Sequence, residues 1–214
     1  MIVRRANWKG KGYLGIFMIS PGKIMRGKVP EIPSQYNYLS LRGSCLVRWD
    51  NDTLMLISGG YWDSKKTYFI NYGATYGAIT EGPTLKKKRY YSACQEMVVN
   101  GEEFVIVAGG NWEWNSVEVL SKKYPEKGWQ LRNWDLPSPQ ESSLMVSSAD
   151  KKNLYIMLPD TPFTSSHTIE KFSCEEDIKK CKWTRLGTKL KIKRGKSLAV
   201  PIPDGFAKKL CDPL

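Results

Sequence analysis

Short runs of apolar residues, each followed by a turn signal, succeed one another along the chain. "FVIVA" at 104–108 is apolar at every position, which is typical of a strand covered on both faces. "SVEVL" (116–120) and "TIEKF" (168–172) alternate polar and apolar positions, which predicts half-exposed outer strands. "DND" (50–52) and "VNGEE" (99–103) lie between apolar runs and predict hairpin turns. The pattern therefore predicts an all-β protein built from short strands.

The strand pattern repeats with a period near 50 residues. Each copy holds a first strand, a turn and a second strand. The copies begin at four serines that are 48, 51 and 54 residues apart: Ser44, Ser92, Ser143 and Ser197. In two copies the second strand ends in a double glycine, and in the third copy Leu158 and Pro159 stand in its place. A repeat of this length is typical of propellers.

Two further strands follow in each complete copy. They are predicted at 67–73 and 76–80, at 116–120 and 128–133, and at 167–174 and 181–187. Trp129 and Trp183 occupy matching positions in two of the fourth strands. Each copy is therefore predicted to form one four-stranded meander.

These copies resemble the kelch repeat, and the resemblance covers nearly the whole chain. The residues that carry it are Gly59, Gly60, Gly109 and Gly110 after second strands, Tyr68 in a third strand, and Trp129 and Trp183 in fourth strands. The resemblance implies a kelch-type β-propeller, in which four-stranded blades pack radially. The third copy departs from the family pattern because it lacks the double glycine, and the first copy lacks the fourth-strand tryptophan.

The two ends of the chain each supply part of a blade. Residues 3–19 align with 107–123, so the chain opens near the end of a second strand. We expect residues 1–214 to form a single unit of about four blades, three whole and one split between the termini. Its parts are the half blade 1–27, the blades 44–80, 92–133 and 143–187, and the half blade 197–211. Because kelch propellers usually have more blades, we expect the chain to be part of a larger propeller; a ring closed by the two half blades is the alternative.

Aromatic residues cluster in the loops after the second strands. The candidate binding residues are Tyr61, Trp62, Trp112, Trp114 and Phe163. Such loops recur on one face of a propeller, and tryptophan is frequent at interaction hot spots. The family resemblance implies a non-catalytic module that binds a protein partner through this face. Two alternatives remain: these tryptophans bind an extracellular carbohydrate by stacking on sugar rings, or they only cover the blade rims.

Catalytic chemistry finds little support in the sequence. His167 is the single histidine, so the histidine ligands of a kelch-like copper oxidase are missing, and we expect no metal and no cofactor. A sialidase-like site would need clustered arginines. Arg42, Arg89 and Arg194 recur before first strands, and we interpret them as residues that pack between blades. The protein is therefore predicted not to be an enzyme.

The net charge of +12 permits binding to polyanions, but the basic residues are dispersed. The densest runs, "LKKKR" (85–89) and "TKLKIKRGK" (188–196), lie in predicted connections and are interpreted as solvated loop charge. We expect no nucleic-acid partner. No stretch is long and apolar enough for a membrane span.

Cysteines and one sequon bear on the compartment. Cys174 and Cys181 are close enough in sequence for a disulfide across a hairpin, with two free cytosolic thiols as the alternative. Asn51-Asp52-Thr53 is a possible glycosylation site in a predicted turn. Together they favour the extracellular space over the cytoplasm.

Overall fold

The computed structural model describes the chain in separate ranges. The backbone is described for residues 2–8, 11–20, 23–26, 43–57, 65–72, 78–111, 113, 115–137, 144–157 and 168–189. Side chains are described within these ranges from residue 43 to residue 187.

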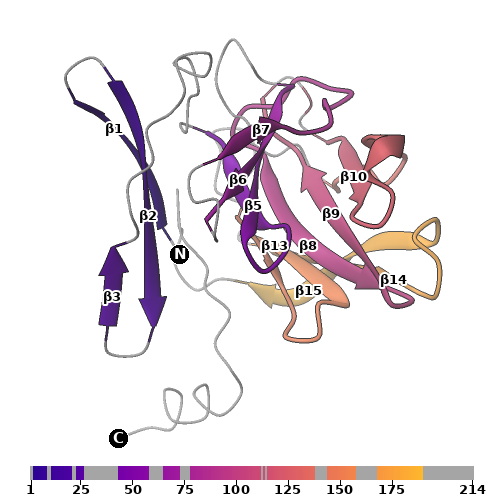
Figure 1. Ribbon diagram of the computed structural model, residues 1–214. Coiled ribbons are helices and arrows are strands. Elements are labelled where there is room, and N and C mark those ends of the chain that lie inside the picture. Colours follow the sequence, from indigo (N-terminus) through magenta and orange to yellow (C-terminus); the bar gives the residue numbers. More distant parts are fainter. Residues whose placement is uncertain are drawn as a thin grey trace, which may run out of the picture.

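Most of the described strands belong to three four-stranded antiparallel sheets (Figure 1). The first contains β4 (Cys45–Arg48), β5 (Thr53–Ile57), β6 (Thr67–Asn71) and β7 (Ile79–Glu81). The second contains β8 (Ala93–Val99), β9 (Glu102–Ala108), β10 (Val117–Ser121) and β11 (Gln130–Arg132). The third contains β12 (Leu144–Ser147), β13 (Asn153–Met157), β14 (Thr168–Cys174) and β15 (Cys181–Lys189). The expectation of an all-β chain built from four-stranded units is confirmed for these three sheets.

A further sheet and one short helix complete the described elements. The sheet has three antiparallel strands in the order β1 (Ile2–Trp8), β2 (Lys11–Ser20) and β3 (Lys23–Arg26). The 3-10 helix η2 (Pro125–Lys127) lies between β10 and β11. No helix in the described ranges is long and apolar enough to cross a membrane.

In each four-stranded sheet, neighbours in sequence are neighbours in space, so the chain runs as a meander. The β8–β9 hairpin shows why the turns form where the sequence predicted them. Val99 pairs with Glu102, which leaves Asn100 and Gly101 as a two-residue turn. Both have positive φ, 48° and 76°, and Asn-Gly is the dipeptide that tolerates this conformation best.

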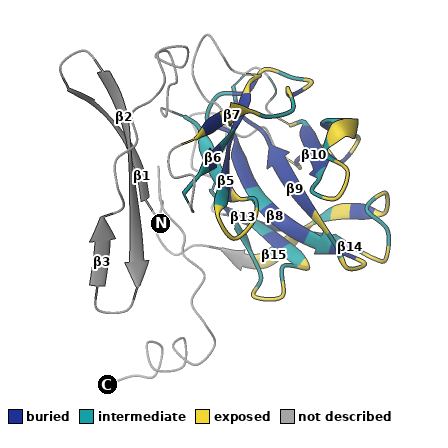
Figure 2. Ribbon diagram, viewed as in Figure 1, coloured by how far each residue is buried: buried dark blue, intermediate teal, exposed yellow. Residues whose placement is uncertain are grey.

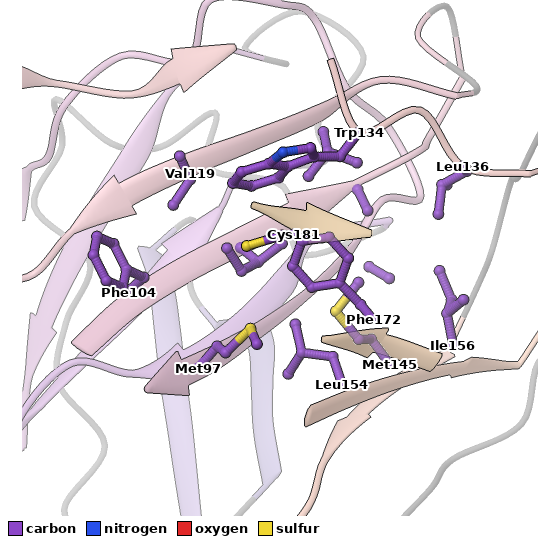
Figure 3. Packing of buried hydrophobic residues seen from close by; sticks show 14 of the residues in the cluster. Met97, Phe104, Val119, Trp134, Leu136, Met145, Leu154, Ile156, Phe172 and Cys181 are labelled. Carbon is purple, nitrogen blue, oxygen red and sulfur yellow. The ribbon is translucent and has the colours of Figure 1, made fainter. Parts of the chain in front are cut away.

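The second sheet is covered on both faces because β9 is apolar at every position from Phe104 to Ala108. Phe104 and Ile106 contribute to one core cluster, which also contains residues of the third sheet such as Phe172 (Figure 3). Val105 and Val107 contribute to another cluster, with residues of the first sheet. The β8–β11 sheet therefore lies between the other two, and its central strands are buried almost throughout (Figure 2).

The polar positions of the third strands differ from the prediction. Glu118 on β10 and Glu170 on β14 are both 0% exposed, although the alternating pattern predicted that they face water. Each strand is paired on both edges, β10 with β9 and β11, and β14 with β13 and β15. The prediction of half-exposed outer strands was therefore wrong at these positions. Glu118 accepts a hydrogen bond from the buried Arg89, and Glu170 Oε1 accepts one from Arg185, whose side chain is exposed.

Two disulfides reinforce the sheets. Cys174–Cys181, predicted from the sequence, joins directly paired residues of β14 and β15. Cys45–Cys94 was not predicted; it joins β4 to β8, the first strands of adjacent sheets, across a separation of 49 residues. In the chain-entropy description, the longer loop stabilises more.

We expect the two disulfides to differ in their effect on stability. Replacing Cys45 and Cys94 by serine should lower the free energy of unfolding by about 4 kcal/mol, and replacing Cys174 and Cys181 by about 2 kcal/mol, because the entropy of loop closure grows with loop length. Chemical denaturation of both double variants measures the difference. An equal or reversed order would contradict the assignment of Cys45–Cys94 as the main covalent restraint.

An ion cluster centred on Glu96 joins the second and third sheets. Lys122, which follows β10, and Lys151, in the β12–β13 turn, each place Nζ 2.8 Å from a different Glu96 carboxylate oxygen. Val98 N–H also donates to the carbonyl of Lys151 at 2.8 Å. Burial raises the pKa of Glu96, but the hydrogen bonds and charges of the two lysines outweigh burial and lower that pKa overall.

The lowered pKa of Glu96 predicts an acid-sensitive contribution to folding. This contribution is complete above the ordinary value of 4.5 and is lost as the pH falls through the lower value of the folded state. Glu96→Gln should therefore be less stable than the wild type at neutral pH, and the difference should shrink below about pH 4. Unfolding measured at several pH values tests this, with Glu126→Gln as the exposed control. A constant difference down to strongly acid pH would contradict the role of the carboxylate.

Candidate binding surface

The predicted binding loops follow the second strands and leave the sheets at the end opposite the first hairpin turns. Because each sheet is a meander, the turn between its first and second strands and the connection between its second and third strands lie at opposite ends of the sheet. The five predicted binding residues lie outside the described residues: Tyr61, Trp62, Trp112, Trp114 and Phe163. Gly59 and Gly60 lie outside them too. In the second sheet, however, the residues on either side of Trp112 and Trp114 are described.

The loop from Gly109 to Ser116 is closed by its own backbone. Gly109 N–H donates to the Ser116 carbonyl at 3.0 Å, and Ser116 N–H donates to the Glu113 carbonyl at 3.2 Å. Asn111 N–H donates to the carbonyl of Tyr90, in the connection before β8, at 2.7 Å. These bonds fix the base of the loop that carries the two tryptophans.

Gly110 has a local reason to be glycine. Its φ is +101°, and a Cβ at this position would lie 3.0 Å from the Tyr90 carbonyl oxygen and 3.2 Å from Ser92. Both the positive φ and the close approach of the preceding connection make a larger residue here strained. The double glycine of this copy thus lets the loop leave β9 against the connection before β8.

A buried arginine holds both ends of the loop. Arg89 Nη1 donates to the carbonyls of Gly109, at 2.9 Å, and Ser116, at 2.8 Å. Its Nη2 donates to Ser116 Oγ at 2.9 Å. We call Arg89 together with Glu118 the loop clamp, because Glu118 holds the guanidinium in place. Arg89 Nε and Nη2 each lie 3.1 Å from Glu118 Oε1.

Both charges of the loop clamp are fully buried and well satisfied. Arg89 and Glu118 are 0% exposed. Glu118 also accepts the backbone N–H groups of Lys86, at 2.7 Å, and Lys87, at 3.1 Å. Burial lowers the pKa of Arg89, and Glu118 opposes this effect. Because both charges are paired and hydrogen-bonded, the clamp fixes one arrangement of the loop at small net cost.

The basic run at 85–89 divides between core and solvent. Leu85 and Arg89 are buried, whereas Lys86 and Lys88 are exposed. Lys87 Nζ lies 3.2 Å from Glu113 Oε1, on the tryptophan loop. The interpretation of this run as solvated charge therefore holds for Lys86 and Lys88. Arg89 is buried, which agrees with its separate interpretation as a residue that packs inside the protein before a first strand.

The two fourth-strand tryptophans make the same contact in two sheets. Trp129 Nε1–H donates to the carbonyl of Pro83, in the connection before β8, at 2.9 Å. Trp183 Nε1–H donates to the carbonyl of Trp134, in the connection before β12, also at 2.9 Å. Tyr68, on β6, is 2% exposed and lies in a cluster on the face of the first sheet that is turned away from the second. The two tryptophans thus tie each fourth strand to the connection that precedes its sheet.

A pocket that the sequence did not indicate lies at the opposite end of the first sheet, beside the turn that contains Asn51. It has a volume of about 350 Å³ and is lined by residues that include Trp49, Asp50, Thr53 and Phe69. The Trp49 and Phe69 ring centroids are 4.8 Å apart. Trp49 precedes the predicted turn directly, and only the folded sheet brings Phe69 beside it. The pocket is therefore an aromatic hollow beside a hairpin turn.

The remaining candidate chemistry is limited. Within the described ranges no group of three or more histidine, cysteine, aspartate or glutamate side chains could hold a metal ion. Asn51 is exposed in the β4–β5 turn. The described geometry thus offers a preorganised loop base and a shallow aromatic pocket.

Comparisons with known proteins add information on the fold alone. No family model matches the chain, and no curated protein matches it. Among solved structures, the chain is similar to the structure of YjhT, with 13% sequence identity and a TM-score of 0.52. The match covers 71% of this chain and 53% of that one, so this chain spans about half the length of YjhT. This likeness supports an all-β fold of related architecture.

We expect loss of the arginine to be costly. Arg89→Met should lower the free energy of unfolding by about 3–5 kcal/mol, because it leaves Glu118 buried without its counter-charge. The double variant Arg89→Met, Glu118→Gln should lose less than the sum of the two single variants, since the two residues interact directly. Denaturant unfolding provides the measurement.

The matched control for the clamp is Lys88→Met. Lys88 is the exposed neighbour of Arg89, so its replacement should change stability by less than about 0.5 kcal/mol. If Arg89→Met behaved like Lys88→Met, the clamp would not hold the loop.

Proposed function

We propose that the three four-stranded sheets are consecutive blades of a kelch-type β-propeller that binds a protein partner without catalysing a reaction. The sequence repeat, the face-to-face packing of successive sheets and the disulfide between the first strands β4 and β8 support this architecture. The recurring tryptophan contact to the preceding connection supports it as well.

The loop clamp is the observation that carries the proposed binding function. A loop held at both ends by Arg89 loses little conformational entropy when it meets a partner, and preorganisation of this kind increases affinity. Trp112 and Trp114 lie within this loop. Tryptophans on a preorganised loop are typical anchors of protein interfaces.

The proposed compartment is extracellular. Two disulfides are formed, and structural disulfides are typical of oxidising compartments. The partner would then be a secreted protein or the outer part of a membrane protein.

The proposal predicts that Trp112→Ala and Trp114→Ala weaken partner binding. The partner is captured on the immobilised chain from extracellular fluid of the source tissue, identified by mass spectrometry, and titrated as a purified protein. Each variant should weaken the affinity about 30-fold or more, since a hot-spot residue contributes at least about 2 kcal/mol. Tyr124→Ala is the control, because Tyr124 is 37% exposed and follows β10, at the opposite end of the same sheet.

Two outcomes would contradict protein recognition through this loop. One is unchanged affinity in both tryptophan variants. The other is binding to immobilised glycans that is lost in the same variants, while a purified protein partner without glycans does not bind. The second outcome would assign the surface to carbohydrate recognition.

A further inference from the structure

The β4–β5 turn contains the one N-x-S/T sequon of the sequence, Asn51-Asp52-Thr53. Asn51 and Asp52 are exposed, and Thr53 begins β5. The turn lies at the end of the first sheet opposite the connection between β5 and β6. A modification here would therefore stay clear of the tryptophan loops.

The turn presents Asn51 in one defined conformation. Asp52 N–H donates to Asp50 Oδ1 at 2.8 Å, and Trp49 N–H donates to the Thr53 carbonyl at 2.9 Å. The hydroxyl of Tyr72, which follows β6, donates to the Asn51 carbonyl. The backbone on either side of Asn51 is thus fixed by the sheet.

The side chain of Asn51 is held through its oxygen, which leaves its nitrogen available. Arg48 Nη2 donates to Asn51 Oδ1 at 2.7 Å. Within the described part of the chain, Asn51 Nδ2 donates to no acceptor. Because Nδ2 is the atom that takes a sugar in N-glycosylation and Oδ1 stays an acceptor afterwards, the contact with Arg48 is compatible with the modified side chain.

We propose that Asn51 carries an N-linked glycan. Nδ2 forms a bond to the anomeric carbon of an oligosaccharide that is carried on a lipid diphosphate. The bond between that carbon and the diphosphate oxygen breaks, Nδ2 loses one proton, and the lipid diphosphate leaves. No atom is oxidised or reduced in this transfer.

The inference rests on the proposed extracellular compartment, which the two disulfides support. Cys45–Cys94 and Cys174–Cys181 both form in the folded protein, and disulfide formation and N-glycosylation are both properties of secreted proteins. The two observations are independent, since neither disulfide includes a residue of the turn.

The glycan also determines what the neighbouring pocket can do. Asp50 and Thr53, on either side of Asn51-Asp52, line the hollow formed by Trp49 and Phe69. A glycan on Asn51 therefore lies beside the mouth of this hollow and obstructs protein partners there. The glycan would then occupy the end of the sheet at the β4–β5 turn, and partner recognition would take place at the opposite end.

The test expresses the full chain behind a cleavable leader in cultured animal cells and recovers it from the medium. Peptide N-glycosidase should increase the electrophoretic mobility of the wild type by one step and convert Asn51 to Asp, as read by peptide mass spectrometry. Thr53→Ser and Thr53→Ala form a matched pair, because serine keeps the sequon and alanine removes it while Asn51 stays unchanged. Thr53→Ser should behave as the wild type.

Thr53→Ala and Asn51→Gln should both migrate as the enzyme-treated wild type, before and after treatment. The proposal is overturned if secreted wild-type protein shows no change on treatment, or if the change persists in Thr53→Ala. Because the readout is the mass of the chain, it does not depend on whether the tryptophan loops bind a partner.

Discussion

The burial of the β8–β11 sheet on both faces is the constraint on which the rest of the structure depends. A strand such as β9, apolar from Phe104 to Ala108, exposes hydrophobic side chains on one side unless a second layer covers it. The first and third sheets supply these layers. Because the second sheet is covered by its two neighbours in sequence, the copies cannot be understood as separate hairpins. The β-run that resumes after Gly109-Gly110 is the next strand of the same sheet.

Burial on both faces leaves little room for unpaired polar groups, and this explains the recurring contacts between sheets and connections. Trp129 and Trp183 each carry an indole N–H into the core and donate it to a carbonyl of the connection before their own sheet. The buried carboxylate of Glu118 accepts hydrogen bonds from two backbone N–H groups of the connection before β8 and from Arg89. In this way the connection before β8 becomes part of the core, and it holds the ends of the neighbouring loop from Gly109 to Ser116 in place.

Much of the fold could be predicted from the sequence because its signals are local. Alternation and turn residues predicted the strands, Asn100-Gly101 forms the predicted hairpin turn, and the spacing of Cys174 and Cys181 predicted their disulfide. Cys45–Cys94 could not be predicted, since a pairing across 49 residues depends on which sheets become neighbours.

The errors and omissions in the candidate surface have the same origin. The position of Arg89 before a first strand indicated packing, but its partner could not be predicted, because a glutamate in an alternating strand suggests exposure to water and only the fold brings Arg89 and Glu118 together. The pocket beside Trp49 was missed for the same reason, because Phe69 reaches it from another strand. The tryptophans of the loops could be singled out by residue type, whereas what holds their loop could not.

The two ends of the sheets are built for different physical demands. At the loop end of the second sheet, buried charges and backbone hydrogen bonds hold both ends of the segment that carries two tryptophans, so the base of the loop proposed for partner binding is already ordered. At the turn end, the short hairpins are closed by local contacts, and Glu96 ties the second sheet to the third through the largely buried Lys122 and the half-buried Lys151. A bulky polar group is proposed at the turn end, where Asn51 is exposed. It would not be tolerated at Gly110, where a single Cβ already approaches a carbonyl too closely. The meander therefore places the turn proposed to carry a glycan and the loop proposed to bind a partner at opposite ends of the sheets. We expect recognition at the loop end, where substitution of Gly110 is most restricted.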